Sequence, residues 1–108
     1  MQPAKKRRLT KAGWRVGTAS QFLGLTKEES AFIEMKLALA RSLKRRRQLR
    51  GITQARLAKQ LGTSQSRLAK MESADRTVSI DLLIRALLEM GTSRKDVAQI
   101  LSRTKSAA

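Results

Sequence analysis

Residues 53–72, TQARLAKQLGTSQSRLAKME, contain two short helical patterns that meet at a glycine. Thr53 is a good N-cap, and Ile52 before it can pack against Leu57 as a hydrophobic staple, so we expect a helix to begin here. An apolar stripe of about two turns follows. Gly62 can end this helix, because glycine adopts the left-handed backbone of a helix C-terminus without steric cost.

A second helix is predicted directly after this turn. Ser64 can cap it, and Leu68 and Met71 would face inward, which leaves an exposed face that is polar and basic. Two short helices joined by a turn of about three or four residues cross at a steep angle. The second helix can then lie in the major groove of DNA while the first spans the phosphates. The stretch therefore predicts a DNA-binding element.

The segments TQARLA and LGTSQSRLAKME resemble the Xre/Cro-type helix-turn-helix of phage repressors and many bacterial regulators. The shared pattern is Thr-Gln-x-x-Leu-Ala, a glycine, a Ser/Thr-Gln turn, and a hydrophobic-x-x-hydrophobic-Glu ending. The resemblance extends over roughly residues 36–102, through a preceding basic helix and the following VSIDLLIRALLEMG. It implies an all-α fold, a five-helix lambda-repressor-like helix-turn-helix domain preceded by an extended N-terminal segment.

The resemblance also implies roles for individual side chains. Gln65, at the start of the second helix, would read a base edge, and Ser66 and Lys70 fall where further base contacts are made. The predicted contacts to the DNA backbone are Gln54, Thr53, Ser64, Arg67 and Arg76. A structural pair is implied between Arg47 and Glu72. The loop that follows, SADRT, departs from the family pattern because it lacks the glycine that many members have there.

The charge balance agrees with a nucleic-acid partner. The chain has 24 Lys and Arg residues against 8 Asp and Glu, a formal charge of +16 in 108 residues. This excess is large enough to bind polyanions without sequence preference. A membrane surface is disfavoured, because the basic stretch LARSLKRRRQLRG has charge on more than one face and lacks the aromatic-rich apolar side of an interfacial helix.

Other chemistries have little support in the composition. The absence of cysteine and histidine excludes a disulfide framework, zinc fingers and the usual transition-metal sites, so we expect no metal and no cofactor. A general base would have to come from a lysine or from the eight carboxylates, for which structural roles suffice, so we expect no enzyme activity. No apolar run reaches ~18 residues and no secretory signal is present, which predicts a cytoplasmic protein.

Three further helices are predicted around the helix-turn-helix. Thr26 and Glu29 can form a capping box that begins a helix of ~24 residues, with acidic residues in its first turn and basic residues in its last. Ser79 can cap the next helix, IDLLIRALLEM, and Ser93 can begin a last one, RKDVAQILSR. We therefore expect one helical domain over residues 26–104.

Residues 1–25 are expected to form a basic, partly disordered arm. Its first part, MQPAKKRRLTK, would either contact a minor groove and its phosphates or remain a solvated tail. Its second part, GWRVGTASQFLGL, would dock onto the helical domain, onto a twofold mate, or onto a different protein. The long helix that follows overhangs so small a domain, and its Phe32 and Ile33 would need a mate, which favours a homodimer.

Together these patterns predict a transcriptional regulator, a repressor that binds a double-stranded DNA operator with sequence specificity. The layout of the whole chain also resembles small HigA-like antitoxins, which implies a RelE-type or phage-derived toxin as a further partner. The alternative is an RNA-binding or nonspecific nucleic-acid-binding basic protein, acting through the arginine-rich helix. Base-stacking platforms need several aromatic rings on a basic face, whereas this chain has only Trp14, Phe22 and Phe32.

Overall fold

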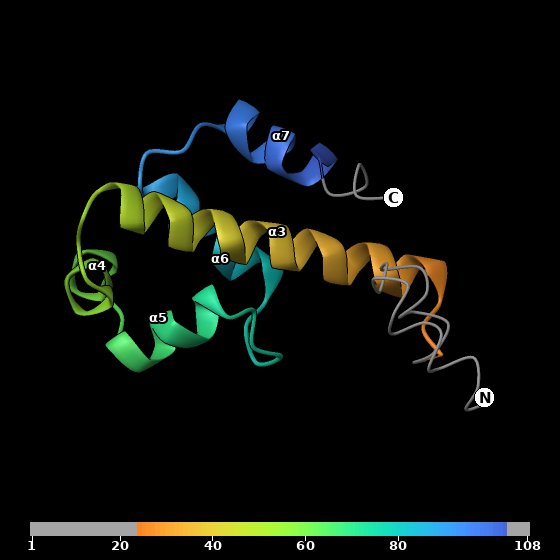
Figure 1. The fold of residues 1–108 in the computed structure, drawn as a ribbon, viewed down its shortest axis with the longest axis horizontal. Coiled ribbons are helices and arrows are strands. Elements are labelled where there is room, and N and C mark those ends of the chain that lie inside the picture. The colour runs from red at the N-terminus through yellow and green to blue at the C-terminus, as the bar shows by residue number, and fades with distance from the viewer. Residues whose placement is uncertain (1–23, 104–108) are drawn as a thin grey trace, which may run out of the picture.

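The computed structural model describes residues 24–103, which form five α-helices and no strand. Their bounds are α3 (Lys27–Leu49), α4 (Gln54–Leu61), α5 (Gln65–Glu72), α6 (Ile80–Glu89) and α7 (Arg94–Arg103). α3 runs through the middle of the molecule, with α4 and α5 on one side, α7 on the other, and α6 crossing behind it (Figure 1). The predicted five-helix, all-α architecture is confirmed over this range. The predicted N-terminal arm lies outside the described residues.

Short hydroxyl side chains begin the helices, as the sequence predicted. The N-caps whose side-chain oxygen accepts a hydrogen bond from the backbone N–H three residues later are Thr26, Thr53, Ser64 and Ser79. Ser93 Oγ does the same for the N–H of Asp96 at 3.0 Å. At α3 the capping box is complete, because Glu29 Oε1 also accepts from the N–H of Thr26 at 2.8 Å. Each such cap stabilises the fold by about 1 kcal/mol.

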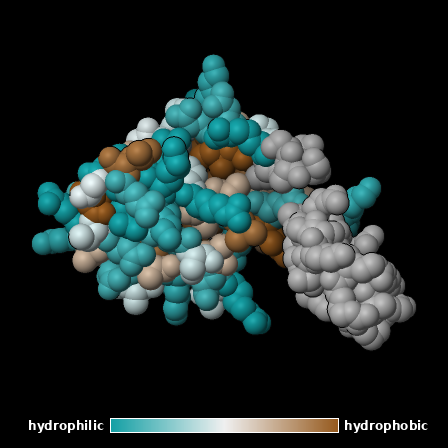
Figure 2. Space-filling model, viewed as in Figure 1, coloured by the Kyte–Doolittle hydropathy of each residue, from teal (hydrophilic) through white to brown (hydrophobic). Residues whose placement is uncertain are grey.

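Leucine side chains from four of the helices make the centre of the core. The largest fully buried side chains are Leu39, Leu43, Leu57, Leu68, Leu83 and Leu87. Replacing any one of them with alanine is expected to cost about 2–5 kcal/mol, because the cavity cannot fully collapse. Leu61 and Leu82 are partly buried and pack against the edge of the core. Hydrophilic side chains cover most of the visible surface (Figure 2).

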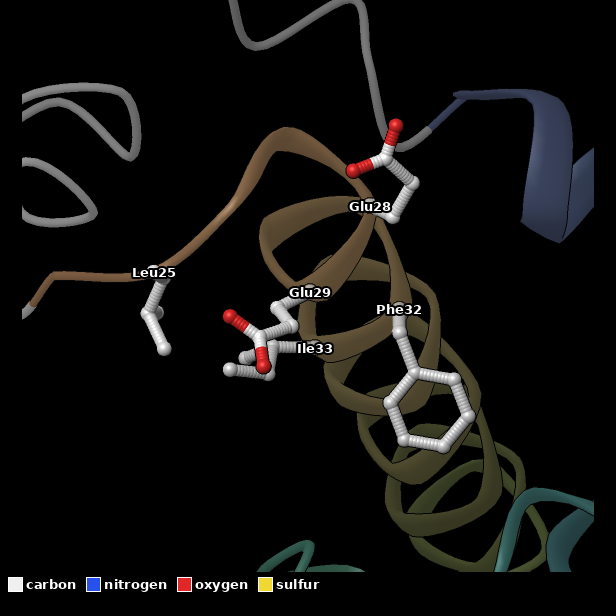
Figure 3. Close-up of a pocket in the computed structure, with 5 residues that line it drawn as sticks. All are labelled: Leu25, Glu28, Glu29, Phe32 and Ile33. Atoms are coloured by element: carbon white, nitrogen blue, oxygen red, sulfur yellow. The ribbon is translucent and has the colours of Figure 1, made fainter.

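The N-terminal part of α3 projects beyond the other helices (Figure 1). The buried side chains of α3 begin at Leu39, while Phe32 and Ile33 remain 50% and 40% exposed. A shallow groove lies on this projecting part. It is lined by Leu25, Glu28, Glu29, Phe32 and Ile33 (Figure 3). The overhang expected from the length of the helix is therefore present, with apolar side chains on it.

Neither a membrane-spanning helix nor a metal cluster is found within residues 24–103. No helix there combines the length and the apolar character that crossing a bilayer requires. The acidic side chains of this range do not gather in groups of three or more that could hold a metal ion.

Candidate nucleic-acid interface

The turn between α4 and α5 sets the angle of the helix pair. Gly62, the C-cap of α4, has φ 73° and ψ 33°, a left-handed conformation that glycine adopts without steric cost. The N–H of Thr63 donates to Ala58 O at 2.9 Å, which closes the end of α4. Ser64 then caps α5 by accepting from the N–H of Arg67 at 3.1 Å. This short connection gives the steep crossing that a DNA-binding helix pair requires.

α5 has one buried face and one exposed face. Leu68 and Met71 are buried in the core. Gln65, Ser66 and Lys70 are exposed. Their amide, hydroxyl and ammonium groups can all hydrogen-bond to base edges in a major groove. The structure thus brings the three predicted base-contacting side chains onto one accessible helix.

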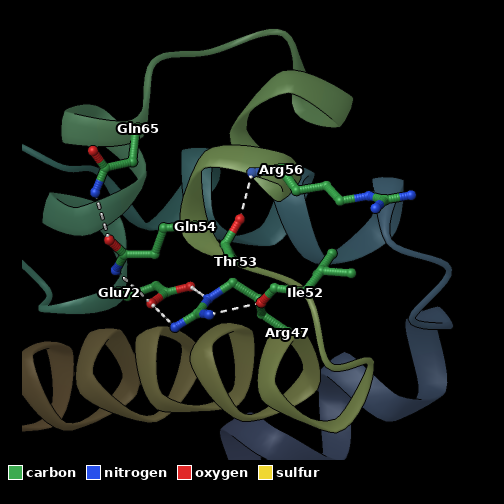
Figure 4. Close-up of polar contacts among 7 residues, drawn as sticks. All are labelled: Arg47, Ile52, Thr53, Gln54, Arg56, Gln65 and Glu72. Atoms are coloured by element: carbon green, nitrogen blue, oxygen red, sulfur yellow. Dashed lines mark hydrogen bonds and ion pairs between the residues drawn. The ribbon is translucent and has the colours of Figure 1, made fainter.

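A chain of hydrogen bonds runs from α3 to the start of α5 (Figure 4). Arg47 donates from Nε to Glu72 Oε2 at 2.6 Å and from Nη2 to Glu72 Oε1 at 3.1 Å. Glu72 Oε1 also accepts from Gln54 Nε2 at 2.9 Å. Gln54 Oε1 in turn accepts from Gln65 Nε2 at 2.9 Å. The guanidinium of Arg47 is further held by Ile52 O, to which Nη1 donates at 2.9 Å.

These hydrogen bonds determine which end of the Gln54 amide faces Glu72. An ionised carboxylate only accepts hydrogen bonds, so the amide group that faces Glu72 must be the NH₂ of Gln54. The oxygen of Gln54 therefore faces Gln65. Gln65 donates one N–H to this oxygen and keeps its second N–H and its carbonyl oxygen for a ligand.

The Arg47–Glu72 pair lies at the base of this chain and is largely removed from solvent. The side chain of Glu72 is 2% exposed and that of Arg47 is 13% exposed. The hydrogen bond to Glu72 raises the pKa of Arg47, against the opposing effect of burial. The hydrogen bonds of this buried pair tie the end of α5 to the C-terminal half of α3.

A known family matches this arrangement. The helix-turn-helix family model covers residues 43–97, from the second half of α3 through α6 and into α7. The chain belongs to the helix-turn-helix family. It is an Xre-type DNA-binding transcriptional regulator with a lambda-repressor-like fold, as the sequence motif predicted. Comparison with curated proteins and with solved structures gave no match.

The surface of the helix-turn-helix is basic. Arg56 and Lys59 of α4 and Arg67 and Lys70 of α5 are exposed. Glu72, the one acidic residue of these two helices, is buried against α3 and does not offset their charge at the surface. A surface of this kind attracts DNA phosphates in a salt-dependent manner.

The residues predicted to contact the DNA backbone lie at the edges of this surface. Thr53 and Ser64 are exposed at the N-termini of α4 and α5, where helix N–H groups favour phosphate. Arg67 is exposed in the first turn of α5, and Arg76 is exposed in the loop that follows α5. Gln54 differs from the others, because it is half-buried and both ends of its amide are bonded within the protein.

The loop after α5 takes a path that glycine normally allows. Ala74 has φ 58°, and the N–H of Asp75 donates to Lys70 O at 2.9 Å, so Ala74 occupies the left-handed position of a Schellman motif. The hydroxyl and the backbone N–H of Thr77 bond to the Asp75 carboxylate and lower its pKa. The turn therefore forms although the loop lacks the glycine that many family members have. The left-handed backbone of Ala74 lowers the folding stability by about 1–2 kcal/mol.

The family resemblance implied a DNA-backbone contact for Gln54 and a base contact for Gln65, but it did not link the two side chains. Each is the first residue of its helix, and the two are 11 positions apart. This spacing indicates contact only once the geometry of the turn is known. The sequence also gave no indication that Arg50 donates from Nη2 to Met90 O and so joins the end of α3 to the end of α6.

Proposed function

We propose that this protein is a repressor that binds a pseudo-palindromic operator in double-stranded DNA as a homodimer, with α5 in the major groove. The observation that carries the proposal is the hydrogen bond between Gln54 and Gln65 at the start of α5. Because Glu72 holds Gln54, Gln65 is oriented before DNA arrives. A pre-oriented side chain loses less conformational entropy on binding, which favours a specific contact.

The chemistry that Gln65 presents suits one base in particular. Its second N–H and its carbonyl oxygen form a donor and an acceptor side by side. Adenine offers the complementary pair in the major groove, an acceptor at N7 and a donor at N6. Ser66 and Lys70, exposed on the same helix, would contact neighbouring bases. Each good bidentate contact contributes about 1–3 kcal/mol of discrimination against a wrong base.

A homodimer is supported by the small size of the DNA-binding element. One helix-turn-helix buries too little surface for tight specific binding alone. Two copies related by a twofold axis would read half-sites ~10 base pairs apart, or a multiple of that spacing. Occupation of such a site excludes other proteins from the same DNA, so repression is the simplest regulatory outcome.

Replacement of Gln65 with alanine tests the proposal. The Gln65→Ala variant should lose about 1–3 kcal/mol of affinity for the selected operator and almost none for random duplexes, because a base contact is lost and no charge is. Gln60→Ala is the matched control, an exposed glutamine of α4 outside the hydrogen-bond chain. Lys70→Ala should weaken operator binding and, if Lys70 also touches phosphate, reduce the salt dependence. Equal losses on both DNAs, or equal affinity of the parent protein for RNA, would contradict the proposal.

A toxin partner is a further part of this proposal, and the groove on the projecting part of α3 supports it. Apolar Phe32 and Ile33 lie there, with the carboxylate of Glu29 beside Ile33 and Glu28 at the end of the groove (Figure 3). This combination suits a basic partner that inserts an apolar side chain. The test uses the product of a toxin-like gene adjacent to the gene for this protein, and ultracentrifugation measures the binding of the two proteins. Phe32→Ala should weaken this binding. Leu49→Ala changes an exposed leucine outside the groove and should leave the binding unchanged. Unchanged binding by both variants would contradict a toxin site in this groove.

A further inference from the structure

One face of α3 carries a stripe of side chains without a partner in the described fold. Glu34, Leu37, Arg41 and Lys44 recur at spacings of three and four residues, so they share one side of the helix. Arg41 and Lys44 are exposed, and Glu34 and Leu37 are half-buried. None of the three charged side chains has a hydrogen bond or ion pair to another side chain within residues 24–103.

Charge is distributed unevenly along this stripe. The acidic residue, Glu34, lies toward the N-terminal end of α3, and the basic residues Arg41 and Lys44 lie toward the C-terminal end. Parallel pairing with a second copy would place each basic residue beside its own counterpart. Antiparallel pairing would place Glu34 of each chain against Arg41 of the partner subunit and would also oppose the two helix dipoles. The stripe is therefore complementary to itself in only one direction.

We propose that this stripe is the dimer interface of the protein, with two α3 helices packed antiparallel. Glu34 of each chain lies opposite Arg41 of the partner subunit, and Leu37 lies beside the twofold axis. The inference rests on the proposed homodimer and specifies its interface. It leaves the groove around Phe32 accessible to another protein.

The resulting geometry suits two recognition helices on one DNA duplex. Arg47, which binds Glu72 at the end of α5, lies about 14 Å along α3 from the twofold axis. The two copies of Arg47 are then about 30 Å apart, once a spacing of 8–10 Å between the helices is included. This separation is close to the ~34 Å between successive major grooves on one side of DNA.

The position of α5 around the α3 axis is also consistent with this dimer. Arg47 lies about 100° around α3 from the centre of the stripe, so α5 lies to the side of the helix pair and not across from the partner subunit. The twofold axis is perpendicular to both α3 helices. It therefore keeps the two α5 helices on the same side of the dimer, where a single duplex can contact both.

Single cysteines test the arrangement directly, because the chain has none of its own. Leu37→Cys should form a disulfide-linked dimer under mild oxidation, since the two copies of this position meet at the axis. Lys44→Cys is the control on the same face, and its two copies would be about 20 Å apart, too far for a disulfide. Crosslinking of Lys44→Cys as efficient as that of Leu37→Cys would indicate parallel pairing and overturn the proposal.

Charge reversal supplies a second, independent readout. Glu34→Arg and Arg41→Glu should each raise the dissociation constant of the dimer about tenfold in ultracentrifugation without DNA, because two ion pairs become two like-charged contacts. The double substitution restores opposite charges and should return the constant close to that of the parent protein. Circular dichroism confirms that each variant is folded. If neither single charge reversal changes the dissociation constant of the dimer, the interface lies elsewhere on the protein. If the parent protein stays monomeric even on its operator, the proposed homodimer is wrong.

Discussion

The Arg47–Glu72 pair makes a quantitative prediction about stability. The side chain of Glu72 is 2% exposed, so Arg47→Met leaves a buried carboxylate whose remaining side-chain donor is Gln54. We expect this variant to lose about 3–5 kcal/mol of unfolding free energy, the usual cost of an uncompensated buried charge. Glu72→Leu should cost less, because the Arg47 side chain is 13% exposed and can turn its guanidinium toward water.

The double variant distinguishes pairing from independent effects. Arg47→Met combined with Glu72→Leu removes both charges, so its loss should be about 2–3 kcal/mol smaller than the sum of the two single losses. Urea unfolding followed by circular dichroism at pH 7 measures all four proteins. Arg45→Met, an exposed neighbour on α3, is the control and should stay within about 0.5 kcal/mol of the parent. Additive single losses, or a loss below 1 kcal/mol for Arg47→Met, would refute the reasoning.

Three further predictions concern the recognition element, the loop after it and the arm. Gln54→Ala should lower the affinity for the operator by about 0.5–1.5 kcal/mol in a binding titration, because Gln65 loses its orienting partner. The affinity for random duplexes should change little. An equal effect on both duplexes would argue against a positioning role for Gln54. Ala74→Gly should raise the unfolding free energy by about 0.5–1 kcal/mol, since the left-handed strain at φ 58° is relieved in part, and a loss of stability would disprove that strain. Deleting residues 1–25 should leave a folded domain, shown by circular dichroism, with weaker DNA binding and a shallower salt dependence; an unfolded product would mean that these residues complete the core.

Local features of the fold could be predicted from the sequence because their causes are local. The capping box at Thr26 involves side-chain and backbone atoms within one turn of helix. Gly62 ends α4 for a reason that concerns its own backbone. Ser79 and Ser93 likewise begin α6 and α7 by accepting a hydrogen bond from a backbone N–H three residues later. These signals need no knowledge of the tertiary structure.

The hydrogen-bond chain that orients Gln65 could not be predicted in the same way. It joins α3, α4 and α5, and its geometry depends on how these helices cross. The family resemblance implied Arg47 with Glu72, but nothing local to Gln54 indicated that its amide would connect this pair to Gln65. The contact from Arg50 to Met90 O links residues 40 positions apart and has no signal in either segment.

Selection of duplexes from a randomised DNA pool tests the central claim most directly. The parent protein should enrich a pseudo-palindrome whose half-sites are ~10 base pairs apart, or a multiple of this spacing, with an adenine at the position that Gln65 reads. Its affinity for the enriched duplex should exceed that for random DNA by at least about 10³-fold at physiological salt. Failure to enrich any sequence, with equal affinity for every duplex, would show that the protein binds DNA by charge alone and would contradict the account.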